Sequence, residues 1–446
     1  MKTMTHARTR FAGALLLALA TAGCGLFDGA DKPKTPTVGD RQPILSRIES
    51  GAVADPSLAS VSVILPPAAA NAEFAQPSGG ASNAYGHLAL GASPVEAWTA
   101  QIAGSGTKER LASPPVIGDG RLYVYDTSAE IRAFDATTGA PIWRKGYRVD
   151  GDGSGAEFGG GVSYNAGRVY LTTGTGEVAA LDAATGDEVW RAKPAGPLRG
   201  APTLAFGSVF VATQNNEIYA LDGATGDVQW FESGAVGQAG VFGVAAPAAA
   251  QGTLIAGYSS GELAAYRYEN GRQLWGDALA RTSVSTSVGT ITDIDANPII
   301  DQGRVYALGQ GGRMAAYELV TGQRIWELNL GGISTPAVAG EWIFTLTSDS
   351  QLLAIQRASG KVKWVVDLPG YRNVEKKKDP IFWTGPVLAG DRLWLANSEG
   401  QIGYASVTDG SLTYLTQLKS KITLPPIVAN STLYVLADDG VIHAYR

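Results

Sequence analysis

Few residues of this chain have the types and spacing that catalysis requires. The 446 residues include three histidines and one cysteine. His6 lies in an N-terminal apolar segment, and His87 and His443 lie at opposite ends of the remaining chain, so the sequence offers no cluster of histidine and cysteine for zinc or iron. His87 and His443 could each act as a general base, but we expect both to have a structural role or to lie at the surface.

One serine lies in a pattern that hydrolases use. Gly257-Tyr258-Ser259-Ser260-Gly261 satisfies the G-x-S-x-G pattern of a nucleophile turn. Such a turn leads from a strand into a helix, whereas an alternating apolar segment, residues 262–268, follows here. Other copies of the same segment carry a Thr-Gly-Thr-Gly or a Ser-Asp sequence in this position. The pattern therefore predicts a hairpin turn and no catalytic serine.

Two further motifs have the composition of ligand-binding loops. Residues 150–155 (DGDGSG) place oxygen ligands at alternate positions, as in a calcium loop, but Gly161 stands at the twelfth position, where a bidentate Glu is required. The basic run at residues 376–378 is bracketed by Glu375 and Asp379, which favours a hydrated loop over a phosphate site. We therefore expect no catalytic residues, no metal and no cofactor.

A repeated unit positions these residues. Residues 168–190 (RVYLTTGTGEVAALDAATGDEVW) and 209–230 (VFVATQNNEIYALDGATGDVQW) each contain two apolar runs, a tight turn and a segment that carries Trp. A Gly precedes the Trp by four residues in six copies, and the pairs are Gly139/Trp143, Gly186/Trp190, Gly226/Trp230, Gly271/Trp275, Gly322/Trp326 and Gly360/Trp364. Gly410 and Tyr414 form a seventh, degenerate copy.

The length of the unit indicates its structure. Successive Trp residues from Trp143 to Trp364 lie 38 to 51 residues apart, which suits four short strands and no long helix. Each unit is therefore predicted to be one blade of a β-propeller. We expect the Gly to adopt a positive φ in the turn between the third and fourth strands, and the Trp to cover a neighbouring blade.

The two ends of the repeat give the number of blades. Trp98 follows no complete unit, and the last unit ends with residues 432–446. If residues 95–102 (VEAWTAQI) supply the missing outer strand of the C-terminal unit, seven internal blades and one shared blade make eight. The predicted fold is all-β: residues 82–446 form an eight-bladed β-propeller of four-stranded blades, closed by an N-terminal strand that joins the C-terminal blade.

The first 81 residues differ in composition. Arg8 and Arg10 precede a short apolar run and then Thr21-Ala22-Gly23-Cys24, which predicts a lipoprotein signal peptide over residues 1–23 and lipidation of Cys24. The apolar run is too short to remain as a membrane span. Residues 24–81 are rich in Ala, Pro, Gly and Ser and are predicted to be a flexible tether, with one ordered patch at residues 61–65.

Charge excludes some classes of partner. The formal net charge is −6, and removing residues 1–23, which contain three basic and no acidic residues, leaves −9. An acidic protein disfavours binding to nucleic acid or to anionic lipid surfaces. We expect no nucleic-acid partner, and contact with a membrane through the lipid anchor only.

The sequences LDAATGDEVW (residues 181–190) and LDGATGDVQW (residues 221–230) resemble the β-propeller repeat of pyrroloquinoline quinone (PQQ) proteins. One branch of that group comprises quinoprotein dehydrogenases, which hold PQQ and calcium at the centre of the ring and carry a pair of adjacent cysteines. This chain has a single cysteine. A PQQ-dependent periplasmic dehydrogenase is nevertheless kept as the alternative from the enzyme class.

The other branch is the BamB family of outer-membrane protein assembly factors, and the resemblance extends over nearly all of the chain after residue 23. Residues 198–202 (LRGAP) resemble that family's L-R-G segment before the third blade, and residues 293–298 (DIDANP) resemble its D-V-D-x-x-P segment before a later blade. Because these segments contact BamA in that family, the resemblance implies four partner-binding residues. They are Leu198 as an apolar anchor, Arg199 as a hydrogen-bond donor, and Asp293 and Asp295 as acceptors for basic groups.

The resemblance to the BamB family implies a non-enzymatic scaffold lipoprotein on the periplasmic face of the outer membrane. It would belong to the β-barrel assembly machinery (BAM complex), bind the POTRA domains of BamA, contact unfolded outer-membrane protein precursors and assist the insertion of barrel proteins. A propeller lipoprotein that binds another envelope protein is a third interpretation.

The propeller topology makes a further prediction about the four candidate residues. Connections in an up-and-down blade alternate between two faces, so the links between blades should lie opposite the Gly-bearing turns. Arg199 and Asp293 should therefore share one face, two blades apart. In the competing interpretation, Arg199 and the aspartates only pair with backbone groups at strand starts.

Overall fold

The computed structural model describes residues 52–147, 159–235, 245–279 and 292–446. The predicted signal peptide, Cys24 and the calcium-like loop at residues 150–155 lie outside these ranges. The chain divides into two compact units, residues 1–50 and residues 51–446, and the account below concerns the second. Its helical content, among the described residues, is one 3-10 turn, η2 (Pro56–Leu58), and no helix there has the length and apolar character needed to cross a membrane.

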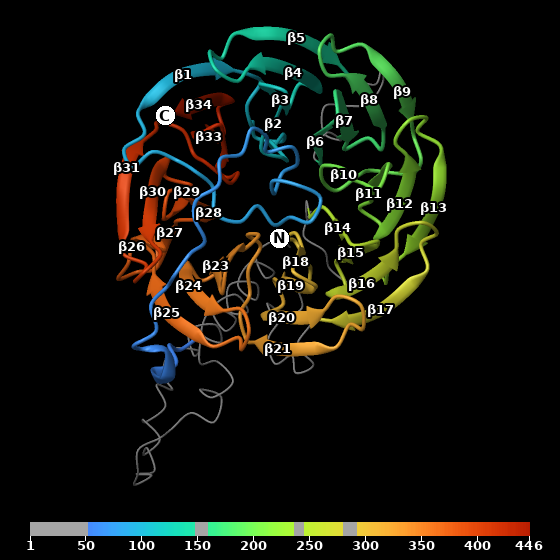
Figure 1. Ribbon diagram of the computed structural model, residues 1–446. Coiled ribbons are helices and arrows are strands. Elements are labelled where there is room, and N and C mark those ends of the chain that lie inside the picture. The colour runs from blue at the N-terminus through green and yellow to red at the C-terminus, as the bar shows by residue number, and fades with distance from the viewer. Residues whose placement is uncertain (1–51, 148–158, 236–244, 280–291) are drawn as a thin grey trace, which may run out of the picture. The chain divides into compact units, whose positions relative to one another are not determined.

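Eight four-stranded antiparallel sheets are arranged around a ring (Figure 1), which confirms the predicted all-β, eight-bladed propeller. The strands of the first four blades are β2 (Val116–Gly118), β3 (Arg121–Tyr125), β4 (Glu130–Asp135), β5 (Pro141–Gly146); β6 (Gly160–Asn165), β7 (Arg168–Thr173), β8 (Val178–Asp182), β9 (Glu188–Ala192); β10 (Thr203–Ala205), β11 (Ser208–Ala212), β12 (Glu217–Asp222), β13 (Val228–Ser233); and β14 (Ala248–Ala250), β15 (Thr253–Gly257), β16 (Glu262–Arg267), β17 (Gln273–Ala278).

The remaining four blades continue around the ring, and a two-stranded hairpin lies between the sixth and the seventh. Their strands are β18 (Ile299–Asp301), β19 (Arg304–Gly309), β20 (Arg313–Glu318), β21 (Arg324–Leu328); β22 (Ala337–Ala339), β23 (Trp342–Leu346), β24 (Gln351–Gln356), β25 (Val362–Asp367); the hairpin β26 (Tyr371–Asn373) and β27 (Lys378–Pro380); β28 (Trp383–Ala389), β29 (Arg392–Asn397), β30 (Gln401–Ser406), β31 (Leu412–Gln417); and β32 (Ile427–Ala429), β33 (Thr432–Leu436), β34 (Val441–Tyr445) with β1 (Glu96–Gln101).

The position of a strand in its blade explains its sequence pattern. The second strand of the third blade, β11, is buried along nearly its whole length and reads as an apolar run. The outer strand, β13, is mostly exposed, and Trp230 is its buried residue. A strand packed on both faces needs apolar residues throughout, whereas a strand at the rim needs them on one face only.

The Gly-x-x-x-Trp pattern provides a contact between neighbouring blades. The Nε1 of Trp190 in the second blade donates a hydrogen bond to the carbonyl of Gly223 in the third blade at 3.1 Å. Gly226 lies beneath the same indole with a φ of +81°, and a Cβ atom there would lie 2.5 Å from Cε3 of Trp190. The Gly thus serves the Trp of the preceding blade, which confirms both the predicted positive φ and the predicted covering role of the Trp.

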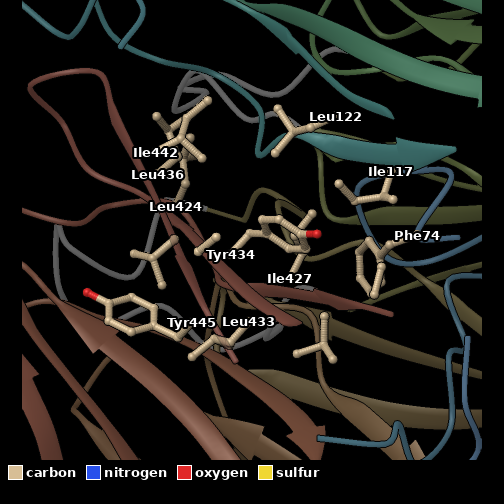
Figure 2. Close-up of a cluster of buried hydrophobic side chains, with 14 of the residues drawn as sticks. Phe74, Ile117, Leu122, Leu424, Ile427, Leu433, Tyr434, Leu436, Ile442 and Tyr445 are labelled. Atoms are coloured by element: carbon tan, nitrogen blue, oxygen red, sulfur yellow. The ribbon is translucent and has the colours of Figure 1, made fainter. Parts of the chain in front are cut away.

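The ring is closed by its two chain ends. Strand β1 pairs with β34 in antiparallel register, as predicted, and Trp98 of β1 packs on Gly139 of the first blade. Figure 2 shows the buried cluster at this junction, in which Tyr434 of the last blade and Ile117 of the first take part. The last blade has no turn between its third and fourth strands, because these come from opposite ends of the chain. The preceding blade accordingly carries Tyr414, which is 46% exposed, in place of Trp.

Residues 69–90, here called the axial segment, cross the centre of the ring (Figure 1) and bond to the innermost strands of seven of the eight blades. Phe74 exchanges backbone hydrogen bonds with Ile117 of β2 at 2.9 and 3.0 Å, and Leu88 donates to Leu388 of β28 at 3.1 Å. The other five strands are reached from Asn71 (β32), Ala75 (β6), Gln76 (β10), Ala81 (β14) and Ser82 (β18).

This packing corrects the tether prediction for residues 52–81. Phe74 is 1% exposed, and Leu58 is also buried. The predicted patch at residues 61–65 contributes Val63 and Leu65, which are partly buried against the cluster between the sixth and seventh blades. The composition of the axial segment predicted a flexible tether because the segment has few large apolar residues. Its order comes instead from hydrogen bonds, mainly from backbone and amide groups, to the unpaired inner edges of the blades.

Candidate functional site

The alternation of strands gives the ring two different faces. Links between blades and the turns between second and third strands lie on one face, here called the link face. The turns between first and second strands and the Gly-bearing turns lie on the other, here called the turn face. The L-R-G segment is the link into β10, and the D-I-D segment is the link into β18, so both belong to the link face.

Arg199, Asp293 and Asp295 meet on the link face. Nη2 of Arg199 donates hydrogen bonds to Oδ1 of Asp293 at 2.9 Å and to Oδ1 of Asp295 at 3.3 Å, between segments 94 and 96 residues apart in sequence. The predicted shared face, two blades apart, is therefore confirmed. The competing interpretation, in which these side chains pair only with backbone groups, is wrong, because the three residues pair with one another.

Backbone hydrogen bonds hold both links against their neighbours. The amide of Arg199 donates to Ala212 at the end of β11 at 2.8 Å, and the carbonyl of Arg199 accepts from Gly160 at 3.2 Å. The carbonyl of Asp293 accepts from Gln310 at 2.9 Å. The ion pair is consequently built on rigid strand ends of several blades, which favours one fixed arrangement of its charges.

The cluster holds two carboxylates and one guanidinium out of water. The side chains of Arg199, Asp293 and Asp295 are 3%, 0% and 8% exposed. Oδ2 of Asp293 is buried and has no hydrogen-bond partner among the described residues. Burial and the adjacent charge of Asp293 raise the pKa of Asp295 to about 7, against the opposing effect of Arg199.

Leu198 does not have the predicted exposure. Its side chain is fully buried in the cluster between the second and third blades, where Tyr170, Trp190 and Leu204 also lie. An apolar anchor must be accessible to a partner, so the prediction of that role for Leu198 is wrong for this conformation. Leu198 instead fixes the link that carries Arg199.

A pocket opens at the centre of the link face. It has a volume of about 380 Å³ and is lined by the residues that lead into the innermost strands of seven blades. The axial segment supplies Phe74, Pro77, Ser78 and Tyr85 to the lining. We call this the central pocket. Sequence reasoning missed it because Phe74, Pro77 and Ser78 belong to the segment assigned to the tether. A Pro recurs shortly before most inner strands, but only some of these prolines, such as Pro114 and Pro425, line the pocket.

The other candidates from the sequence are structural. His87 is buried; its Nδ1 lies 2.8 Å from the carbonyl of Pro66, and its Nε2 accepts from the amide of Asp391 at 2.9 Å. His443 Nδ1 lies 2.6 Å from Oε1 of Glu96, at the junction of the chain ends. Residues 258–261 form the turn between β15 and β16, as predicted. Within the described ranges, no group of three or more His, Cys, Asp or Glu side chains is arranged to hold a metal ion.

Fold and site together define the protein as an eight-bladed propeller of the PQQ-repeat type, with a charged cluster and an apolar pocket on its link face. The sequence matches the family described as "Outer membrane protein assembly factor BamB" over residues 91–154 and 127–366. It is 30% identical over 356 residues to the BamB of Salmonella typhimurium (strain LT2), covering 79% of this chain and 88% of that protein. The chain belongs to the BamB family of outer-membrane protein assembly factors.

Solved structures agree on the fold. The crystal structure of BamB from Moraxella catarrhalis superposes with a TM-score of 0.62 at 18% identity, covering 79% of this chain and 99% of that one. Quinohemoprotein alcohol dehydrogenase from Comamonas testosteroni superposes with a TM-score of 0.66 at 14% identity, covering 85% and 81%. Identities this low show the fold alone. Several other BamB proteins are matched over about half of their length.

Proposed function

We propose that this protein is a non-enzymatic scaffold of the BAM complex that binds the POTRA domains of BamA through its link face. Membership of the BamB family supports a role in outer-membrane protein assembly. One observation carries the finer proposal: the two family segments, far apart in sequence, are joined by the hydrogen bond from Arg199 to Asp293. A pair of segments held together in this way forms a single surface that a partner can recognise.

The four candidate residues then act mainly by shaping this surface. Leu198, Arg199 and Asp293 are buried, so they hold the two links in place, and Asp295 borders the central pocket. Exposed neighbours such as Pro197 and Asn215 then make the direct contacts with BamA. The carbonyl of Pro197 accepts a hydrogen bond from the amide of Gln214, which places Pro197 beside the turn that contains Asn215. Removing one member of a buried ion pair typically costs about 3 to 5 kcal/mol, so changes at the cluster alter the face as a whole.

We further propose the attachment expected from the sequence. Residues 1–23 are a signal peptide, Cys24 is lipidated, and the residues up to 51 tether the propeller to the periplasmic face of the outer membrane. Labelling with radioactive palmitate tests this assignment. The wild-type protein should incorporate label, and Cys24→Ala should incorporate none; label retained by Cys24→Ala would disprove the anchor.

The position of the axial segment also supports a scaffold over a quinone enzyme. Quinoprotein dehydrogenases hold their cofactor at the centre of the ring, and here Phe74, Ala81 and Leu88 bond to the inner strands along that axis. A cofactor at the level of the axial segment would have to displace those contacts. The structural likeness to an alcohol dehydrogenase is therefore a likeness of fold.

Co-purification with BamA tests the proposed face. Asn215 and Ala224 are exposed residues of the same blade, in turns on the link face and on the turn face respectively. We expect Asn215→Arg to reduce BamA capture by about tenfold or more, because a hot-spot contact is typically worth more than about 1.4 kcal/mol. Ala224→Arg should leave capture unchanged. Equal capture by both variants, or loss with Ala224→Arg only, would refute the assignment of the link face.

A further inference from the structure

The central pocket is large enough to bind a ligand. Its volume of about 380 Å³ lies within the range of small-molecule sites, which is roughly 300 to 1,000 Å³. An apolar cavity of about 150 Å³ already holds benzene, so this pocket has room for one or two aromatic side chains. The axial segment blocks the channel below, and an entering chain can therefore insert a side chain but cannot thread through the ring.

The lining favours an apolar group. Phe74, Tyr85, Val387 and Leu424 contribute apolar surface to the wall and floor. At the rim, Ile333 is 54% exposed and Phe382 is 66% exposed. Large apolar side chains that are gathered around a cavity in this way mark a binding surface, because covering each exposed ring or branched chain lowers the free energy.

The charge of the wall selects among apolar ligands. Among the residues that the structure describes, Asp295 is the only charged one that lines the pocket. Above its pKa of about 7, Asp295 is ionised and shares Arg199 with Asp293, so the cluster then carries two acidic groups and one basic group. A ligand with a negative charge at this point would be repelled, and a lysine or arginine beside the inserted apolar group would complete the pairing.

We propose that the central pocket binds an extended polypeptide segment by taking up an aromatic side chain whose neighbour, a lysine or arginine, pairs with Asp295. This inference rests on the proposed role in outer-membrane protein assembly, which brings unfolded barrel strands near the protein. Barrel strands alternate apolar and polar residues and carry aromatic residues near the membrane interfaces, so they contain segments of this chemistry. The pocket recognises such a segment one side chain at a time.

A fluorescein-labelled peptide tests the proposal with the isolated, full-length protein. The probe is a short Gly/Ser peptide with a central Lys-Phe pair, and two control peptides replace the Phe by Ala or the Lys by Glu. At about pH 8, above the pKa of Asp295, we expect fluorescence anisotropy to show binding of the Lys-Phe peptide and affinities about tenfold weaker for both controls. Equal affinity for all three peptides would overturn the proposal.

Variants locate the binding site. Ser334 is a half-buried residue of the pocket wall, and Ser334→Trp should fill the pocket and weaken the Lys-Phe peptide by about tenfold or more. Ala224→Trp, which adds the same ring on the turn face, should leave the affinity unchanged. Asp295→Asn should remove the preference for Lys over Glu while leaving the preference for Phe over Ala. Circular dichroism must show that each variant keeps the wild-type fold.

The two proposals fail independently because the peptide assay contains no BamA. Unchanged peptide binding by Ser334→Trp would overturn the pocket assignment and leave the link-face assignment standing. Loss of BamA capture by Ser334→Trp, with no effect of the Trp on peptide affinity, would assign the pocket to BamA instead. Retained BamA capture together with weakened peptide binding supports the polypeptide segment as the occupant.

Discussion

At the scale of single residues, two glycines of the third blade illustrate two different reasons why a turn requires glycine. Gly226 and Gly207 both lie in turns of the third blade with positive φ, at +81° and +78°. A Cβ atom at Gly226 would lie 2.5 Å from the ring of Trp190, whereas one at Gly207 would meet no atom within 4 Å. A side chain at position 207 would therefore meet only the cost of the left-handed backbone conformation. A side chain at position 226 would meet that cost and would also clash with Trp190 of the preceding blade.

Replacing each of these glycines by alanine should give different costs. Gly207→Ala should lower the free energy of unfolding by about 1 to 2 kcal/mol, the usual cost of a left-handed conformation with a Cβ atom. Gly226→Ala should cost about 1 to 3 kcal/mol more, because Trp190 must move. Denaturant titration of both variants measures the difference. Equal costs would show that the Gly/Trp contact does not stabilise the ring.

The buried acid Asp295 gives a pH-dependent prediction. In the folded protein, burial and Asp293 raise its pKa to about 7, while Arg199 opposes the shift. An unfolded Asp has a pKa of about 3.9, so the folded state binds more protons between about pH 4 and pH 7, and stability falls as pH rises through this interval. Asp295→Asn removes this titration.

The melting temperature of Asp295→Asn should therefore rise relative to wild type between about pH 5 and about pH 8. Asp227→Asn, at an exposed acid of a Gly-bearing turn, is the matched control for the substitution itself. Thermal unfolding across this range makes the measurement. A difference between Asp295→Asn and wild type that is constant with pH would show that Asp295 is ionised throughout.

At the scale of elements, the sequence predicted the strands of the blades but did not predict the axial segment. The blades were predictable because each repeat places a Gly four residues before a Trp, and because the sequences of the inner strands are apolar runs. The axial segment was not, since its pairing partners are inner strands spread over the whole ring. The same holds for the site: the link-face location of Arg199 and Asp293 followed from topology, while their mutual contact and the burial of Leu198 depend on packing between blades.

Phe74 tests the contribution of the axial segment. It is 1% exposed and packs with Ile117 and Tyr434 in the cluster of Figure 2. Phe74→Ala should lower the free energy of unfolding by about 3 to 5 kcal/mol, as expected for a buried Phe. Phe206→Ala, at a side chain 43% exposed on the turn face, should cost much less. Denaturant titration of both proteins decides; a small loss for Phe74→Ala would show that the axial segment is a loose covering.

At the scale of the whole molecule, the ring converts distant sequence segments into one surface. Pairing of β1 with β34 closes the ring, and the axial segment bonds seven of the blades to a common centre. The links that carry Arg199 and Asp293 are thereby held in one arrangement, with the central pocket beside them. A rigid disc with one chemically distinct face is suited to hold a partner in a fixed orientation, which is the property that a scaffold needs.

Photo-cross-linking in intact cells tests the central claim most directly. A photoreactive amino acid is placed at Asn215 on the link face or at Ala224 on the turn face, and adducts are identified by mass spectrometry. The account predicts an adduct with BamA from position 215 and none from position 224. A BamA adduct from position 224 alone, or adducts from position 215 with other envelope proteins and none with BamA, would contradict it.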